Sequence, residues 1–223
     1  VILWGIGAMG KGIAEMLLKK KGVEIVGVVG RGDKLTKSMY DFLDVERNGQ
    51  EDVIIGTYEE IITKEAADIV VIATDSFTKT SFDKIKHCLV NKINVVSTAE
   101  EMAYPKAQEP ELAKEIDRLA KENNVTVLGT GINPGLIMDL LVIALTGACI
   151  DVDHIKAERV NNLSPFGPAV MHGQGVGISL EEFNKRVGDN TLDGHVGFPE
   201  SIHMISDALG WKLSKEVELS RQP

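Results

Sequence analysis

The sequence predicts an α/β fold built on a parallel sheet. Short apolar runs alternate with amphipathic, helix-like segments along residues 1–135. The run Ile69-Val-Val-Ile72 is continuously apolar and β-branched, as strands buried on both faces of a sheet usually are. Regular alternation of strand and helix is typical of parallel sheets whose crossover connections are helices.

The first residues combine a strand, a glycine turn and the start of a helix. The apolar run Val1–Trp4 leads into Gly5, Gly7 and Gly10, and an apolar helical spacing follows. In a dinucleotide site, the first glycine makes the tight turn, the second lets the backbone approach a pyrophosphate, and the third lets helix and strand pack closely. Free N–H groups at the helix N-terminus then bind phosphates. The sequence therefore predicts a Rossmann dinucleotide-binding domain. Its predicted phosphate-binding residues are Gly5, Gly7, Ala8, Met9 and Gly10.

A cationic side chain follows the second predicted strand, Val23–Val29. Enzymes that prefer NAD usually carry Asp or Glu near this position, to bind the ribose 2′-hydroxyl. This chain carries Arg31, with Lys34 nearby and the acidic Asp33 slightly late, and an arginine suits a 2′-phosphate. We predict NADP or NAD as cofactor, with Arg31 favouring NADP. The alternative is a solvated loop arginine.

Polar side chains follow the predicted strand at 68–73. Ligands of open parallel sheets lie beyond the carboxyl ends of the strands, so we expect Thr74, Asp75 and Ser76 to face the cofactor. Asp75 contacts either the ribose or a substrate ammonium. Alternatively, Asp75 or Ser76 only caps the helix that begins near Phe77.

Two later strand ends offer further candidates. Strand 94–97 leads to the acidic pair Glu100-Glu101, and Glu101 is a candidate carboxylate for an amine, unless the pair is simply solvated. Strand 125–128 ends in a glycine-rich turn, where backbone can approach a flat nicotinamide ring. Gly131 is a cofactor candidate there, and Asn133 is a candidate for the carboxamide or the substrate. The remaining predicted helices of this part are 58–66 and 109–123.

The pattern changes after Cys149. We predict a strand over 151–160, then a long polar, glycine-rich passage, and helices over 179–187 and 199–209. Ser179 and Glu182 form a capping-box pattern at the first of these helices. The predicted division is a cofactor domain at 1–135, a connecting helix at 136–149, and a partial α+β domain for substrate or dimerisation at 150–223.

Polar residues of the last part supply the substrate and acid–base candidates. A long polar loop is more often functional than decorative. Arg159 is the candidate partner of a substrate carboxylate, because Arg makes bidentate pairs, although a surface arginine is equally compatible. His195, flanked by glycines, is the first candidate base and His172 the second. The orienting candidates are Asn161, Asn162 and Ser164.

Composition limits the partners. The 223 residues carry a net charge of −9, which argues against nucleic acid and anionic membrane surfaces as partners, because no basic field is available. No apolar run reaches the roughly eighteen residues of a membrane span. Cys88 and Cys149 have no metal or redox spacing, so we expect no metal, and buried thiols in the cytoplasm. Because the chain starts inside a strand and without Met, we expect it to be part of a longer protein.

Several stretches carry a family resemblance. They are WGIGAMGKGIAEMLLKKKGVEIVGVVGRG, STAEEMAYPKAQEPELAKEIDRLAKENNVTVLGTGINPGLIMDLLV, RVNNLSPFGPAVM and GHVGFPESIHMISDALGWKL. Over nearly its whole length the chain resembles the 2,4-diaminopentanoate dehydrogenase family of amino-acid-fermenting anaerobes, within the dihydrodipicolinate reductase-like superfamily.

The resemblance implies oxidative deamination of a small diamino acid in ornithine breakdown, with NAD or NADP taking the hydride. A homodimer is the default expectation for such enzymes. One departure matters. Dihydrodipicolinate reductases carry paired histidines and a lysine where this chain has Arg159-Val-Asn-Asn162, so their acid–base residues do not transfer. The alternatives are another NADP-dependent oxidoreductase of this superfamily, or an NADP-sensing protein without turnover.

Overall fold

The computed structural model describes residues 1–47, 49–192 and 194–223. It divides into two compact units, which we call unit 1 (Val1–Gly131) and unit 2 (Ile132–Pro223). The division falls within the glycine-rich turn that follows the last strand of the sheet, slightly before the boundary expected from the sequence.

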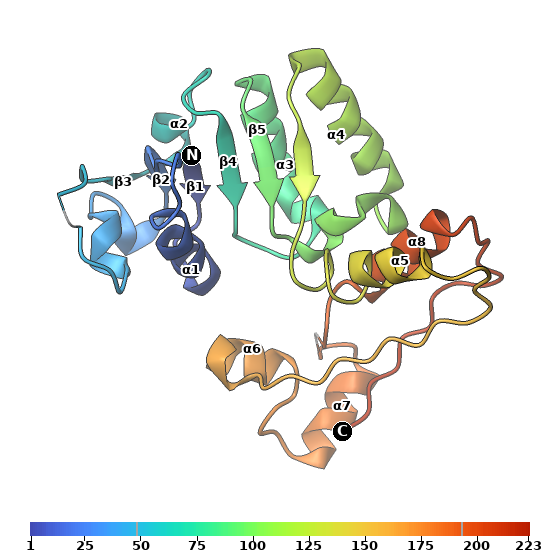
Figure 1. The fold of residues 1–223 in the computed structure, drawn as a ribbon. Coiled ribbons are helices and arrows are strands. Elements are labelled where there is room, and N and C mark those ends of the chain that lie inside the picture. Colours follow the sequence, from blue (N-terminus) through green and yellow to red (C-terminus); the bar gives the residue numbers. More distant parts are fainter. Residues whose placement is uncertain (48, 193) are drawn as a thin grey trace. The chain divides into compact units, whose positions relative to one another are not determined.

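Within its described residues, unit 1 holds a six-stranded parallel sheet with the order β3-β2-β1-β4-β5-β6 (Figure 1). The α/β fold with a parallel sheet, predicted from the alternating pattern, is therefore confirmed. The order reverses direction between β1 and β4, which is where open α/β sheets bind their ligands. The strands are β1 (Ile2–Trp4), β2 (Gly27–Val29), β3 (Ile55–Gly56), β4 (Ile69–Ile72), β5 (Asn94–Ser97) and β6 (Val127–Gly129).

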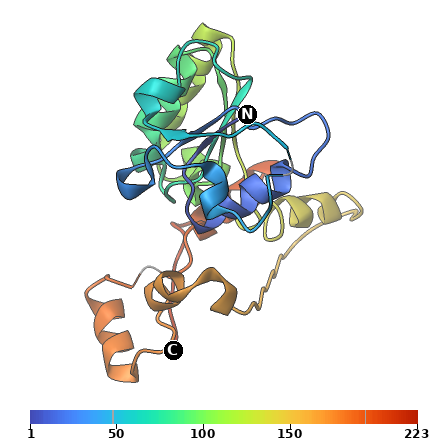
Figure 2. The ribbon, with the colours of Figure 1, turned by 90° about the vertical axis from the view of Figure 1, so that its left-hand side faces the viewer.

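Strand β1 feeds two cores because successive side chains point to opposite faces of a sheet. Ile2 and Trp4 pack into the core formed with α3 and α4, whereas Leu3 packs into the core formed with α1. Seen along the sheet, α3 and α4 lie on one side of it (Figure 2). The helices of unit 1 are α1 (Ala8–Leu17), α2 (Tyr58–Ile61), α3 (Thr78–Val90) and α4 (Pro110–Asn123).

Unit 2 is helical in its described residues. Its helices are α5 (Leu140–Thr146), α6 (Pro168–Gly173), α7 (Leu180–Gly188) and α8 (Phe198–Ala208). The predicted cap of α7 is confirmed, since the Ser179 hydroxyl accepts a hydrogen bond of 3.2 Å from the Glu182 N–H. α6 was not expected from the sequence.

Two predicted elements of unit 1 are shorter than expected. The segment 23–29 is a strand only from Gly27, because its partner β1 begins at Ile2, which pairs with Gly27. The predicted helix 58–66 ends at Ile61. There the chain turns toward β4, and the Glu65 N–H donates to the Asn91 carbonyl over 2.8 Å.

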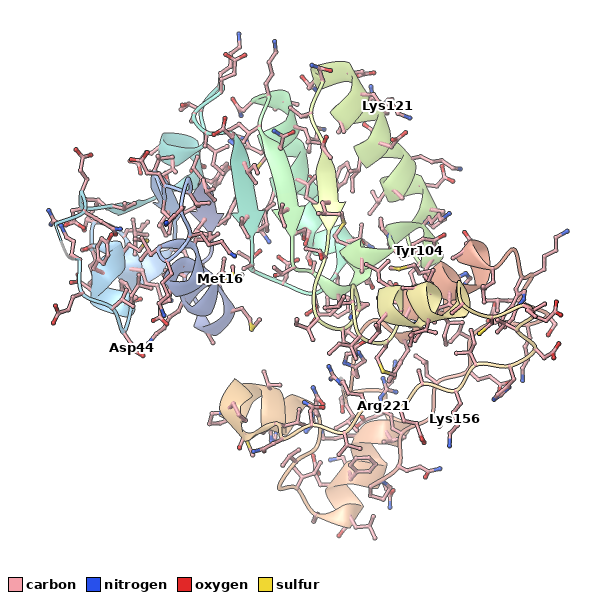
Figure 3. The ribbon with its side chains drawn as sticks, viewed as in Figure 1. Met16, Asp44, Tyr104, Lys121, Lys156 and Arg221 are labelled. Atoms are coloured by element: carbon pink, nitrogen blue, oxygen red, sulfur yellow. The ribbon has the colours of Figure 1, made fainter. Side chains whose placement is uncertain are left out.

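The strand predicted over 151–160 is wrong. These residues have no regular structure, and Ile150 and Val160 are each 99% exposed. An alternating pattern makes a strand only when a neighbour satisfies its backbone, and no described segment pairs with this one. The segment carries Lys156, whose side chain points away from the ribbon (Figure 3).

Two predictions around α5 also need correction. The helix expected from Leu136 starts at Leu140, after a turn that Asp139 closes as the helix cap. Cys149, expected to be buried, is exposed because it follows the end of α5, whereas Cys88 is buried as predicted. Burial raises the pKa of the Cys88 thiol to about 12, so this thiol is unreactive.

Candidate functional site

A cavity of about 940 Å³ opens where β1, β2 and β4 end. Four of the predicted cofactor residues line it: Gly5, Gly7, Arg31 and Thr74. The cavity lies at the reversal of the strand order, on the carboxyl side of the strands, where dinucleotides bind in such sheets.

The three glycines of the predicted phosphate-binding turn, Gly5, Gly7 and Gly10, differ in their surroundings. Gly5 has a φ of +107°, and a Cβ there would lie 2.8 Å from the Ala73 carbonyl oxygen. A Cβ on Gly10 would lie 1.9 Å from the Gly5 carbonyl oxygen, whereas no described atom lies within 4 Å of a Cβ built on Gly7. Gly5 and Gly10 are therefore fixed by packing, and the open approach at Gly7 fits a phosphate group.

The residues after β2 bring two cations, Arg31 and Lys34, and one acid, Asp33, to the cavity. Arg31 is exposed at the cavity. The Lys34 ammonium donates to the Ile6 carbonyl over 2.9 Å and lies 5.4 Å from the centre of the Phe42 ring. Lys34 is thus anchored beside the glycine turn, and Arg31 is exposed at the same cavity.

Three aromatic rings form another side of the cavity. The rings of Trp4 and Tyr58 stack at 5.4 Å with an angle of 13° between their planes. The His87 ring meets Tyr58 edge-on at 5.0 Å. Sequence reasoning missed this cluster, because Trp4, Tyr58 and His87 come from β1, α2 and α3 and meet only in the fold.

Asp75 is held by side chains of α3 and its own neighbour. Its carboxylate accepts from the hydroxyls of Thr74 (2.7 Å), Thr80 (2.9 Å) and Ser81, and from the Lys84 ammonium. Burial raises the pKa of Asp75, but the bonds from Lys84 and the hydroxyls outweigh it, so the pKa is lowered overall. The carboxylate is ionised and already carries a cation as partner.

Glu101 is buried and caps α3. Its carboxylate accepts from the Thr78 N–H over 2.8 Å, and Gln108 donates to its other oxygen over 3.3 Å. Burial raises the pKa of Glu101, and the bond from Thr78 opposes this only in part. The Glu101 N–H donates to the carbonyl of Ser76, which ties the loops after β4 and β5 together.

In unit 2, the structure brings two predicted site residues together. Asn133 Nδ2 lies 3.1 Å from His195 Nε2, although 62 positions separate them in the chain. The His195 ring also meets the Phe198 ring edge-on at 4.8 Å. Burial lowers the pKa of His195, and the positive charge of Arg159 lowers it further. The imidazole is therefore neutral and able to accept a proton at neutral pH.

The other polar candidates of unit 2 make contacts of their own. Ser164 donates through its N–H (3.0 Å) and hydroxyl (2.8 Å) to the Asn162 side chain. Arg186 donates to the His172 carbonyl over 3.0 Å. Asn161 and Arg159 are exposed. In the described part of unit 2, no hydrogen bond joins these groups to the Asn133–His195 pair.

Asp139 is a further polar residue that sequence reasoning missed. It is fully buried, and its carboxylate accepts from the Gly135 N–H (2.8 Å), the Leu140 N–H (2.6 Å) and the Ser201 hydroxyl (2.9 Å). A signal was present, because a lone acid in the apolar run LIMDLL needs buried partners.

Residues 1–130 match the model of the oxidoreductase family with an NAD-binding Rossmann fold. The chain belongs to this family. Residues 136–223 match the 2,4-diaminopentanoate dehydrogenase C-terminal domain. The dinucleotide-binding fold predicted from the glycine turn is thereby confirmed.

Two known proteins are similar over all or nearly all of the chain. The chain is 66% identical over 223 residues to a 2,4-diaminopentanoate dehydrogenase of Acetoanaerobium sticklandii, covering 100% of this chain and 63% of that protein. The predicted family resemblance is confirmed. The solved structure of an amine dehydrogenase from Mycobacterium smegmatis superimposes with a TM-score of 0.74 at 26% identity, over 96% of this chain and 62% of that one. The chain thus spans less than two thirds of the length of either relative.

The donor set of unit 1 fits the nicotinamide dinucleotide of this family. The fit rests on the open approach at Gly7, the cation Arg31, and α1, whose first turn carries no acidic residue.

Among the described residues, no three His, Cys, Asp or Glu are grouped to hold a metal ion. No helix in the described ranges has the length and apolarity that a membrane crossing requires.

Proposed function

We propose that the protein catalyses the NAD(P)-dependent oxidative deamination of 2,4-diaminopentanoate to 2-amino-4-oxopentanoate and ammonia. The observation that carries this proposal is the 66% identity to the 2,4-diaminopentanoate dehydrogenase of A. sticklandii, which extends over both units. The amine dehydrogenase from M. smegmatis supports chemistry at a C–N bond.

Unit 1 would bind the dinucleotide. The N–H groups at the start of α1 face the pyrophosphate, and Ala8, Met9 and Gly10 form that first turn. Arg31 pairs with a 2′-phosphate, which favours NADP over NAD, with Lys34 adding positive charge. Thr74 and Ser76 lie at the ribose side, and Gly131 at the nicotinamide side. When bound, the nicotinamide accepts a hydride.

His195 would act as the general base. A substrate ammonium must lose a proton before its nitrogen lone pair can expel a hydride from the neighbouring carbon. The side-chain nitrogen of Asn133, Nδ2, faces His195 Nε2 in the structure. A half turn of that amide exchanges its nitrogen and oxygen, so that Nε2–H donates to Asn133 and the Nδ1 lone pair takes the substrate proton. Water then adds to the iminium carbon, and ammonia leaves.

Other polar groups would hold the substrate. Arg159 binds its carboxylate, and three polar neighbours orient it: Asn161, Asn162 and Ser164. Glu101 and His172 are the second candidates for proton transfer. Asp75 is a less suitable ammonium partner, because Lys84 already occupies its carboxylate.

The test is turnover by the purified protein with 2,4-diaminopentanoate and either cofactor, followed by the absorbance of reduced nicotinamide and by ammonia release. His195→Gln should lower kcat by about 10²- to 10⁴-fold, and His154→Gln, an exposed histidine of unit 2, should not. Turnover of another amine, with none of this substrate, would overturn the substrate assignment. Cofactor binding without any hydride transfer would favour the sensing alternative.

The remaining expectations extend this proposal. We infer a homodimer acting in ornithine breakdown in the cytoplasm, with a small diamino acid as partner and no nucleic acid. Light scattering of the purified protein tests the dimer, and a mass of one chain would contradict it.

A further inference from the structure

Two segments of unit 2 carry the Asn133–His195 pair. Asn133 lies in the turn before α5, and His195 lies just before α8, with its ring against Phe198 in the first turn of that helix. The two side chains meet only if these segments keep a fixed separation. A contact of 3.1 Å between an amide and a ring nitrogen is lost when that separation changes by about 1 Å.

Asp139 joins the same two segments. One carboxylate oxygen, Oδ2, accepts both from the Gly135 N–H and from the Ser201 hydroxyl. Gly135 belongs to the turn of Asn133, and Ser201 belongs to the first turns of α8. The other oxygen caps α5 at Leu140. All three donors therefore depend on a single side chain that is 0% exposed.

We propose that Asp139 is a positioning residue, whose carboxylate sets the distance between Asn133 and His195 by tying the turn at Gly135 to α8 at Ser201. The catalytic consequence rests on the proposed role of His195 as base. The positioning itself does not, because it concerns contacts of the protein alone.

A carboxylate suits this place better than an amide. Its two oxygens accept three N–H or O–H donors, and an asparagine would turn its NH₂ group toward at least one of them. The buried donor would then lack an acceptor. Asp139→Asn should therefore loosen both segments, whereas Ser201→Ala should release only α8.

The experiment compares Ser201→Ala with Ser206→Ala. Both serines are buried in α8, but the Ser206 hydroxyl donates to the His203 carbonyl of its own helix, over 3.1 Å. The first measurement is the titration of the His195 ring by NMR, assigned with His195→Gln. The second is kcat/KM against pH. The cofactor Kd serves as a control for folding.

In Ser201→Ala, we expect the pKa of His195 to rise toward its ordinary value, as the ring loses burial. kcat should fall about tenfold, and the acid limb of kcat/KM should move with the ring titration. Ser206→Ala should change none of these. If the Asp139→Asn protein folds, it should raise the pKa of the His195 ring further than Ser201→Ala does. If it does not fold, the Ser201→Ala result is sufficient to test the proposal.

An unchanged ring titration in Ser201→Ala would overturn the proposal. If the ring titration shifts while the pH profile of turnover stays in place, Asp139 positions His195, and the role of His195 as base is the part that fails.

Discussion

The two acidic candidates that follow β4 and β5, Asp75 and Glu101, are already bonded within the protein. Asp75 carries Lys84 and three hydroxyls, and Glu101 caps α3 through Thr78. A substrate amine could reach Asp75 only by displacing the Lys84 ammonium. A neutral imidazole needs no such exchange, and for this reason His195 remains the preferred base.

Charge near His195 affects the pH range in which its ring could serve as the proposed base. The pKa of His195 is lowered by burial and, in addition, by the positive charge of Arg159. Replacing Arg159 with Met removes that charge, so the pKa of His195 rises. As the pH falls, the His195 ring is then protonated at a higher pH than in the unchanged protein. The acid limb of kcat/KM should therefore move upward by less than about one pH unit, because Arg159 is exposed and its charge is screened.

Lys156→Met is the matched control for this prediction. Lys156 is an exposed cation of the same segment, and it pairs with Glu158 over 3.1 Å. Its loss should leave the acid limb in place. An acid limb that moves downward in Arg159→Met, or moves equally in both variants, would contradict the electrostatic account.

At the scale of the element, α1 requires glycine at position 10 but not at position 12. Gly10 and Gly12 both lie in α1. A Cβ on Gly10 would overlap the Gly5 carbonyl oxygen at 1.9 Å, whereas no described atom lies within 4 Å of a Cβ on Gly12.

Alanine at these two positions should therefore act in opposite directions. Gly12→Ala should raise the free energy of unfolding by about 0.5–1 kcal/mol, because alanine loses less backbone entropy in a helix. Gly10→Ala should lower it by about 1–3 kcal/mol through overpacking. Urea unfolding of both variants checks the pair, and a stabilised Gly10→Ala would show that the turn at Gly5 yields without cost.

Strands surrounded by other strands could be predicted from the sequence, because their burial leaves a local pattern. The continuous β-branched run of β4 and the residues of β5 appear at the expected positions. The alternation over 151–160 is equally clear but has no partner strand in the described residues. A pattern shows which face a strand would bury, and it does not show what pairs with its edge.

At the scale of the whole molecule, the predicted functions divide between the two units. The glycine turn, Arg31 and the aromatic cluster belong to unit 1, whereas Asn133, Asp139 and His195 belong to unit 2. Binding of the dinucleotide and transfer of the proton should therefore respond to different replacements.

Because of this division, we expect Arg31→Ala and His195→Gln to have different effects on cofactor binding and on turnover. Arg31→Ala should raise the Kd of NADP about tenfold to a hundredfold, the loss of a charged hydrogen bond, and should barely change that of NAD. His195→Gln should leave both Kd values unchanged while turnover falls. Titration of cofactor fluorescence measures the Kd values. Equal weakening of NAD and NADP by Arg31→Ala would contradict a role at the 2′-phosphate.

The two halves of the candidate site differ in how far the sequence could predict them. The cofactor half of the site could be predicted, because the spacing of the glycines along the chain is itself the motif. Asn133 and His195 could each be chosen for their chemistry, but their contact spans 62 positions. Asp139 was missed because its function lies in the segments it joins, which only the folded chain brings together.

The stacked ring of Trp4 gives the cavity an optical property. The chain holds two tryptophans, and only Trp4 lines the cavity, among the residues described there. Indole emission overlaps the absorption of reduced nicotinamide, so a reduced cofactor bound in the cavity would quench Trp4 and would itself be excited by energy transfer. With Trp211 replaced by Phe, binding of the reduced cofactor should move fluorescence from the tryptophan band to the nicotinamide band, and release should reverse this. Both events can then be followed in real time without an added dye.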